Sequence, residues 1–209
     1  MSLMYIPEHF ALDAAQTAQF LTTVVAGDLV TATDDGLAAT FLPLLLDRDQ
    51  GRNGSFLGHL ARNNAQWKGA VHGEALVIAH GPDAYVSPSW YPSKAEHGRV
   101  VPTWDHSTAH VYGALVVHDD EAWLDSLVRR LTERHESGRA HPWSVDDASA
   151  KYIDGQLQAI VGVEIVISRV EVQVKMNQNR PAADIDGVVI GLAHDGFQDV
   201  AAMVEQWRP

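Results

Sequence analysis

Three segments of the sequence combine residue types that are able to bind a charged or aromatic ligand. The first spans residues 58–68, where a predicted strand ends and a short predicted helix begins. Backbone N–H groups at the start of a helix are unpaired and point outward, which favours a bound anion. Arg62 and Lys68 add positive charge, and Asn63 and Gln66 add neutral donors. This segment predicts a site for a phosphate monoester; the alternative is a solvated strand-to-helix connection.

The second segment is polar and follows a long predicted strand. Over residues 175–181 it places the amides of Gln178 and Asn179 and the guanidinium of Arg180 directly before Pro181. Two amides and a cation at one strand end are typical of a ligand clamp, and equally of a surface turn.

The third segment is aromatic. It contains Tyr85, Trp90 and Tyr91, and a later stretch adds Thr103 and Trp104. Indole and phenol rings can enclose a flat heteroaromatic ligand by stacking. Packing in the core or along a dimer interface is the alternative explanation.

The sequence gives little support for a metal site, for cysteine chemistry or for a nucleophilic enzyme. His106 and His110 have the i, i+4 spacing that places two metal ligands together on a helix, but the surrounding residues predict a strand and no third ligand is near. The chain has no cysteine, which excludes disulfides, thiolate metal sites and cysteine nucleophiles. Phosphate-loop, dinucleotide-binding and nucleophile-elbow motifs are absent from the sequence. We assign no catalytic residue and no metal ligand.

The elements that must position these residues are mostly strands joined by turns. The sequence predicts helices near 13–25, 119–131, 142–157, 182–192 and 197–206, and strands near 29–31, 39–46, 55–60, 75–80, 85–87, 109–117 and 160–176. Residues 81–83 are expected to form a turn, residues 65–73 a short helix or loop, and the proline-rich residues 88–104 a long ordered loop.

The last predicted strand changes face. Its apolar residues occupy odd positions up to Ile167 and even positions from Val170 onward. A period of two cannot change face without an extra residue, so a bulge or bend is expected at Ser168-Arg169. Small closed barrels need such corners, and one barrel with helical decoration is the fold we expect.

The bulk composition narrows the class of protein. We expect a single domain over residues 4–209, and we interpret residues 1–3 as an expression scar. No stretch approaches the roughly 18 apolar residues of a membrane span, so a cytoplasmic protein without membrane contact is expected. Fifteen Lys and Arg against 27 Asp and Glu give a net charge of −12, which repels the phosphate backbone of DNA.

Several motifs, in this order, resemble the PaiB-like family of FMN-binding negative transcriptional regulators. The resemblance covers about residues 4–192, and the residues that carry it are Tyr5-Ile6-Pro7, Ala39-Thr40-Phe41-Leu42-Pro43-Leu44, Gly58-His59-Leu60-Ala61-Arg62-Asn63-Asn64-Ala65-Gln66-Trp67, His80-Gly81-Pro82-Asp83-Ala84-Tyr85-Val86-Ser87-Pro88-Ser89-Trp90-Tyr91, Val101-Pro102-Thr103-Trp104 and Gln178-Asn179-Arg180.

The resemblance implies a mainly β split barrel like that of flavin reductases and pyridoxamine-phosphate oxidases, a homodimer, and FMN at the subunit interface. It places the phosphate near the end of the strand at His59, the flavin rings along residues 40–43, and groups of the partner chain over them. The implied cofactor-binding residues are Thr40, Leu42, His59, Arg62, Asn63, Gln66, Trp67, Lys68, Trp90, Thr103, Trp104, Gln178, Asn179 and Arg180.

The family further implies a repressor. Because the chain is acidic and no basic recognition helix is visible, we expect regulation to act through a protein partner rather than by direct reading of DNA. The alternative is a flavin-dependent oxidoreductase that uses the same FMN site. Asp105 departs from the family pattern, and an acidic group beside a flavin disfavours its anionic reduced form.

Overall fold

The computed structural model describes residues 4–69 and 71–209. The segment interpreted as an expression scar, residues 1–3, lies outside the described residues. Within the described chain, no helix is both long enough and apolar enough to cross a bilayer.

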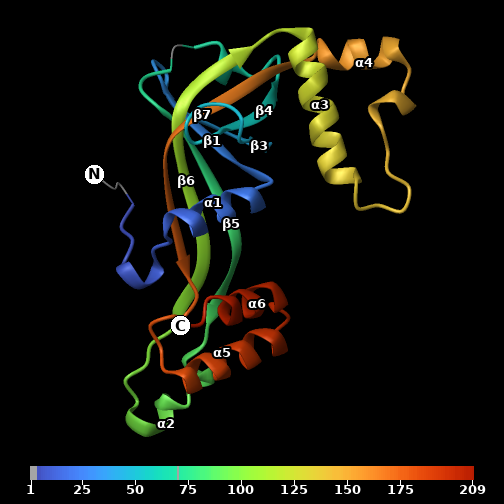
Figure 1. Cartoon of the computed structure of the whole chain (residues 1–209). Helices are drawn as coiled ribbons and strands as arrows, with labels where there is room; N and C mark the ends of the chain where they lie inside the picture. The colour runs from blue at the N-terminus through green and yellow to red at the C-terminus, as the bar shows by residue number, and fades with distance from the viewer. Residues whose placement is uncertain (1–3, 70) are drawn as a thin grey trace. The chain divides into compact units, whose positions relative to one another are not determined.

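The strands form one sheet in the order β2-β1-β5-β6-β7-β4-β3. β1 pairs antiparallel with β2 and β5, and β4 pairs antiparallel with β3 and β7. The strands are β1 (Ala26–Thr33), β2 (Gly36–Pro43), β3 (Leu45–Asp47), β4 (Ser55–Ala61), β5 (Ala75–Val86), β6 (Thr103–His118) and β7 (Ile160–Lys175), coloured by position along the chain in Figure 1.

The α-helices occupy the two ends of the chain, the connection from β5 to β6 and the long connection from β6 to β7. The α-helices are α1 (Ala14–Thr23), α2 (Ser93–His97), α3 (Glu121–Glu136), α4 (Ala150–Leu157), α5 (Ala182–His194) and α6 (Gln198–Gln206). The short 3-10 helices are η1 (Glu8–Phe10), η2 (Ala65–Trp67), η3 (Pro88–Trp90) and η4 (Val145–Asp147).

The chain divides into two compact units, which we describe separately. The first contains the residues up to Gln19, His80–Ala109 and Glu171–Pro209. Its fully buried residues include Val86, Val174, Met176, Ile185 and Leu192.

The second unit contains Phe20–Ala79 and His110–Val170. Leu29, Phe56 and Ile165 are completely buried there. A cluster of α3 leucines, Leu127 and Leu131, packs on β3 and β4. The helix begins where the sequence predicts, because Asp120 caps it by accepting the N–H of Trp123 at 2.8 Å.

The turn expected at residues 81–83 is wrong. β5 continues through them from Ala75 to Val86, although Pro82 lacks the N–H that a central strand uses. The pairing of β5 with β1 covers only Leu76–Ile78. Since Pro82 lies beyond that register, its missing donor breaks no hydrogen bond to β1.

The helix expected over residues 142–157 is also interrupted. Ser144 and Asp147 form a capping box, but it opens only η4, and Ala148 then adopts an extended conformation with φ −94° and ψ 156°. A regular helix resumes at Ala150. This capping box therefore starts a single turn rather than the long helix.

The change of face in β7 is confirmed by burial. Among the large apolar residues, Val161, Val163, Ile165 and Ile167 are buried before the exposed Ser168, and Val172, Val174 and Met176 are buried after it. The two tail helices are confirmed as α5 and α6.

Candidate functional site

A buried amide fixes the connection from β4 to η2. Asn64 caps η2, because its Oδ1 accepts the N–H of Gln66 at 2.8 Å. Gln66 is 5% exposed; its Nε2 donates to the Leu29 carbonyl oxygen at 2.9 Å and to Thr31 Oγ1 at 3.1 Å. Thr40 Oγ1 donates to Gln66 Oε1 at 2.6 Å and accepts from Asn64 Nδ2 at 3.0 Å. Both ends of the Gln66 amide are therefore bonded within the protein.

Arg62 also has protein partners. Its Nε donates to the carbonyl oxygen of Gln158 at 2.7 Å, and Nη2 donates to that of Ile160 at 2.8 Å and to Asp119 Oδ1 at 2.5 Å. The hydrogen bond from Arg62 lowers the pKa of Asp119 and raises that of the guanidinium. Arg62 thus joins β4 to the start of β7, and Asp119 balances its charge.

Two donors of the same segment face solvent. Asn63 and Lys68 are both exposed. The Lys68 ammonium lies 5.5 Å from the centroid of the Trp67 ring, and Trp67 Nε1 donates to the Arg62 carbonyl oxygen at 3.1 Å. Of the residues expected to hold phosphate, Asn63 and Lys68 are the most accessible.

Leu42 is a core residue. Its side chain is 2% exposed and lies against Gly58, where a Cβ atom would come within 2.7 Å of Leu42 Cδ1. Any contact of Leu42 with a flavin therefore comes from its backbone.

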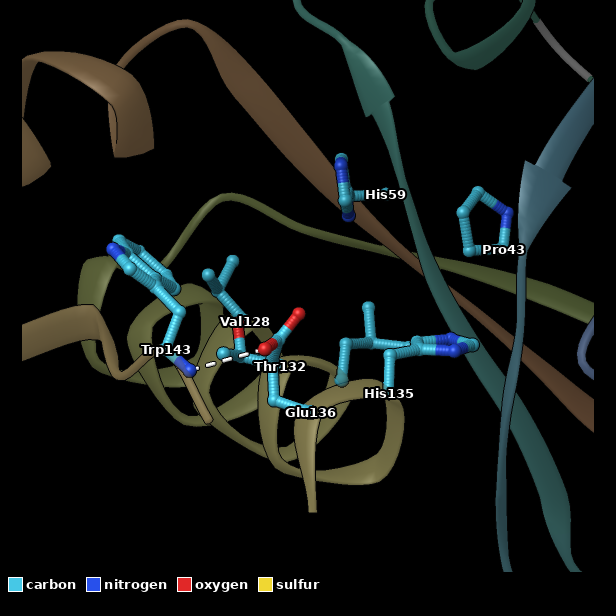
Figure 2. Close-up of a pocket in the computed structure, with 8 residues that line it drawn as sticks. Pro43, His59, Val128, Thr132, His135, Glu136 and Trp143 are labelled. Atoms are coloured by element: carbon cyan, nitrogen blue, oxygen red, sulfur yellow. Dashed lines mark hydrogen bonds between the residues drawn. The ribbon is translucent and has the colours of Figure 1, made fainter. Parts of the chain in front are cut away.

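His59 faces a cavity of about 310 Å³ in the second unit (Figure 2). Its Nδ1 is buried and has no hydrogen-bond partner among the described residues. Burial lowers the pKa of the imidazole, which favours the neutral ring. The other lining residues come from β2, α3 and the connection after α3: Pro43, Val128, Leu131, Thr132, His135, Glu136 and Trp143.

In the first unit, the predicted aromatic residues lie in two places. Trp104 is 52% exposed, and its Nε1 donates to Asp83 Oδ1 at 2.7 Å. The Tyr85 ring meets it edge to face with centroids 6.4 Å apart. Trp90 instead packs on α5, where Gly191 has no Cβ and leaves room for the indole.

A buried carboxyl group lies at the centre of the first unit's polar residues. Asp105 is fully buried; its Oδ2 accepts from Asn177 Nδ2, whose Oδ1 in turn accepts from the Tyr91 hydroxyl at 3.0 Å. Asp105 Oδ1 has no partner among the described residues. Burial raises the pKa of Asp105 to about 7, against the opposing effects of Lys175, the Asn177 hydrogen bond and Arg180.

Two cations flank this carboxyl group. Lys175 Nζ donates to Thr103 Oγ1 and, at 2.7 Å, to the carbonyl oxygen of Trp104. The Arg180 guanidinium lies 4.9 Å from the centroid of the Tyr91 ring. Thr103 is therefore joined to the end of β7 through a lysine rather than left open to a ligand.

The amide side chains before Pro181 differ in their hydrogen bonds and in their exposure. Gln178 closes its own turn, since its Oε1 accepts the N–H of Met176 at 2.7 Å and its Nε2 donates to the Val174 carbonyl oxygen at 2.7 Å. Asn179 is exposed. Asn177, with φ 61°, adopts the left-handed conformation that asparagine tolerates better than most residues.

The structure thus brings the predicted residues together in groups. Thr40 and Gln66 meet with Asn64, while His59 lies in the α3 cavity and Arg62 pairs with Asp119. In the first unit, Thr103 is linked to Trp104 through Lys175.

Sequence reasoning missed the α3 side of the cavity. His135 and Glu136 end α3, and the Trp143 N–H returns to donate to Glu136 Oε2 at 3.0 Å. The signal was a His-Glu pair at the end of an amphipathic helix, followed within a few residues by Pro-Trp. Only the fold shows that these residues face His59.

Comparison with solved structures identifies the fold class of this chain. A flavocytochrome, Anf3 from Azotobacter vinelandii, superposes with a TM-score of 0.59 at 12% identity, over 84% of this chain and 74% of that one. An FAD and haem binding protein from Mycobacterium smegmatis superposes with a TM-score of 0.56 at 14% identity, over 86% and 80% of the two chains. The fold is the split β-barrel with helical decoration, the class expected from the sequence.

The sequence comparisons are more specific. Residues 4–169 match the family model FMN_bind_2, described as "Putative FMN-binding domain". The protease synthase and sporulation protein PAI 2 of Bacillus subtilis is 30% identical over 204 residues, covering 97% of this chain and 95% of that protein. An Emericella nidulans protein, AN0679, is 28% identical over 84% of this chain and 81% of its own length. The chain belongs to this FMN-binding, PaiB-like family, and FMN is its cofactor.

Proposed function

We propose that the chain is an FMN-binding regulator that works as a cytoplasmic homodimer and acts through a protein partner rather than by reading DNA. The observation that carries the second half of this proposal is the charge. The net charge is −12, and several of the cations are already paired with carboxylates. Ion pairs engage Arg62, Arg129, Arg130, Arg139 and Arg208. The 27 acidic residues outnumber all 15 cations, so the chain offers a phosphate backbone no net electrostatic attraction.

For FMN we propose that the phosphate binds at the connection from β4 to η2. Asn63 and Lys68 offer an exposed amide and an exposed ammonium there, a donor set that suits a phosphate monoester. Gln66 and Thr40 act as positioning residues, because their polar atoms are bonded to each other and to β1. Arg62 holds the strand end in place through Asp119 and the backbone.

The predicted residues of the first unit would meet the flavin from the partner subunit. Trp104 is half exposed and offers a ring for stacking, and Asn179 is an exposed amide. Trp90, Thr103, Gln178 and Arg180 would support them, since each already has contacts inside its own unit. When bound, FMN supplies one- and two-electron redox chemistry, and the protein supplies binding and electrostatics.

The homodimer proposal is supported by the edge strand β2. Leu37 and Phe41 point to the same side of this strand and are 82% and 68% exposed. Large apolar side chains alternating along an exposed edge strand are unfavourable in a monomer and are normally covered.

A test of the phosphate site uses two lysine variants. We expect Lys68→Glu to weaken FMN binding by about 10-fold or more, because it replaces a charge-assisted donor with a repelling carboxylate. Lys151→Glu makes the same charge change on the exposed surface of α4 and is expected to leave FMN binding within about twofold. Equal FMN affinity of the two variants, measured by quenching of flavin fluorescence, would refute this site.

The regulatory role is tested in the source organism. Deleting the gene is expected to change a defined set of transcripts, and the intact gene, but not the Lys68→Glu form, is expected to restore them. The purified FMN-loaded protein is expected to give no sequence-specific, salt-sensitive gel shift with the promoters of those genes. Unchanged transcripts would contradict a regulator, and a specific shift would contradict indirect action.

A flavin-dependent oxidoreductase is the second candidate. The observation in its favour is the half-buried His59, whose pKa is lowered by burial, in a cavity of about 310 Å³, a place where a substrate fits. Oxidation of NADH or NADPH by the FMN-loaded protein, at a rate well above that of free FMN, would support it.

A further inference from the structure

We propose that the cavity between β4 and α3 binds a small, uncharged aromatic molecule at a site separate from FMN. This proposal concerns the second unit alone and does not depend on a regulatory or an enzymatic role for the protein.

The walls of the cavity suit a flat ring. Pro43, Val128 and Leu131 give it apolar sides, and Trp143 closes one side with an indole that is 47% exposed (Figure 2). The volume of about 310 Å³ lies at the lower end of the range for small-molecule sites and matches one or two fused rings better than an extended chain. Stacking on an indole further favours a planar ligand.

One polar atom in the cavity lacks a partner. His59 Nδ1 is buried without a hydrogen bond, whereas buried polar groups in proteins are nearly always paired. A hydroxyl group on the ligand can donate to this nitrogen or accept from it, so it satisfies either tautomer of the ring. A ligand with one such group therefore gives His59 Nδ1 the hydrogen bond that the described protein residues do not provide.

The charges around the cavity favour a neutral ligand. The Glu136 carboxylate already accepts the N–H of Trp143 at 3.0 Å and pairs with Arg139 Nε at 3.0 Å. No lysine or arginine is among the described residues that line the cavity, so an anion finds no permanent positive charge there. The same absence argues against the phosphate of FMN, and this separates the cavity from the cofactor.

Three probes with one ring system test the proposal on the FMN-loaded protein. Naphthol is expected to bind at one molecule per chain in isothermal titration calorimetry, without releasing FMN. Naphthalene lacks the hydroxyl and leaves His59 Nδ1 unpaired, and naphthoate carries a charge, so each is expected to bind at least about 10-fold more weakly.

Variants locate the binding. Trp143→Ala removes one wall and is expected to weaken naphthol binding by about 10-fold or more. Tyr152→Ala removes an aromatic of α4 that is 60% exposed and does not line the cavity, and it is expected to bind naphthol as the parent does. His59→Phe keeps a ring but removes the nitrogen, so naphthol should lose its advantage over naphthalene.

Three results would overturn the proposal. The first is the absence of saturable naphthol binding. The second is release of FMN in proportion to bound naphthol, which would make the cavity part of the flavin site. The third is unchanged binding in both Trp143→Ala and His59→Phe, which would place the ligand elsewhere.

Discussion

The polar residues between His59 and Lys68 differ in what they bond. Gln66 and Arg62 are engaged by the protein, whereas Asn63 and Lys68 face solvent. Residue type alone does not separate these roles, because an amide or a cation serves a fold and a ligand equally well. The sequence therefore predicted correctly that a strand ends and a helical turn begins here, but it grouped anchors and accessible donors together.

Gln66 is expected to contribute to the stability of the fold even when FMN is absent. Gln66→Leu leaves the Leu29 carbonyl oxygen and Thr31 and Thr40 without their amide partner, which should lower the free energy of unfolding by about 2–3 kcal/mol. Asn63→Ala, at an exposed position, is expected to change it by less than about 0.5 kcal/mol. Urea titration without FMN measures both, and equal midpoints would contradict the anchoring role.

Asp105 should make stability depend on pH. Its pKa is raised from 3.8 to about 7 in the folded protein, so the native state keeps a proton that the unfolded chain has lost. Its contribution is thus complete below about pH 4 and disappears as the pH rises through about 7. The cost of the ionised form is on the order of a few kcal/mol, and no more than about 4.

The variant Asp105→Asn isolates this effect. It cannot ionise, so relative to the parent it should gain stability between pH 5 and about 8, and the gain should grow with pH. Urea titrations of both proteins at several pH values give the difference directly, since the other ionisable groups are common to them. A difference that does not vary with pH would contradict the raised pKa of Asp105.

Among the elements, those with strong local signals are the ones that the sequence located well. Two such signals can be recognised from residues that are close in sequence. They are the cap by Asp120 at the start of α3, and the change from odd to even apolar positions in β7. The continuation of β5 through Pro82 was not predictable in this way. It depends on where pairing with β1 ends, and that register is set by the whole sheet.

The contact of α3 with β7 depends on a missing side chain. The Trp123 ring lies on Gly162, where a Cβ atom would overlap the indole, and it also stacks on the His118 ring with centroids 4.1 Å apart. Gly162→Ala is therefore expected to displace Trp123 and to lower the free energy of unfolding by about 1–3 kcal/mol.

A glycine of α4 provides the control for this substitution. A Cβ at Gly155 meets nothing within 4 Å, so Gly155→Ala should raise stability by about 0.5–1 kcal/mol through helix propensity. The two glycines are thus expected to respond with opposite signs in thermal or urea unfolding. A stabilising Gly162→Ala would show that the indole moves at no cost.

At the scale of the whole molecule, the sequence predicted the fold class and the cofactor through motifs spread over most of the chain. The superposition on the flavocytochrome Anf3 confirms the fold class, and the match of residues 4–169 to the FMN-binding domain family confirms the cofactor. Assembly was not predictable from residue patterns. A dimer interface uses the same apolar side chains as a core, and only their exposure on β2, at Leu37 and Phe41, distinguishes them.

The most direct test of the central claim is sedimentation velocity of the purified protein, recorded at the flavin absorbance and at the protein absorbance together. We predict that both signals sediment as one species containing two 22.8 kDa chains, with one FMN per chain. The contrary result is flavin that sediments as free FMN beside a single 22.8 kDa chain, even after saturation with FMN.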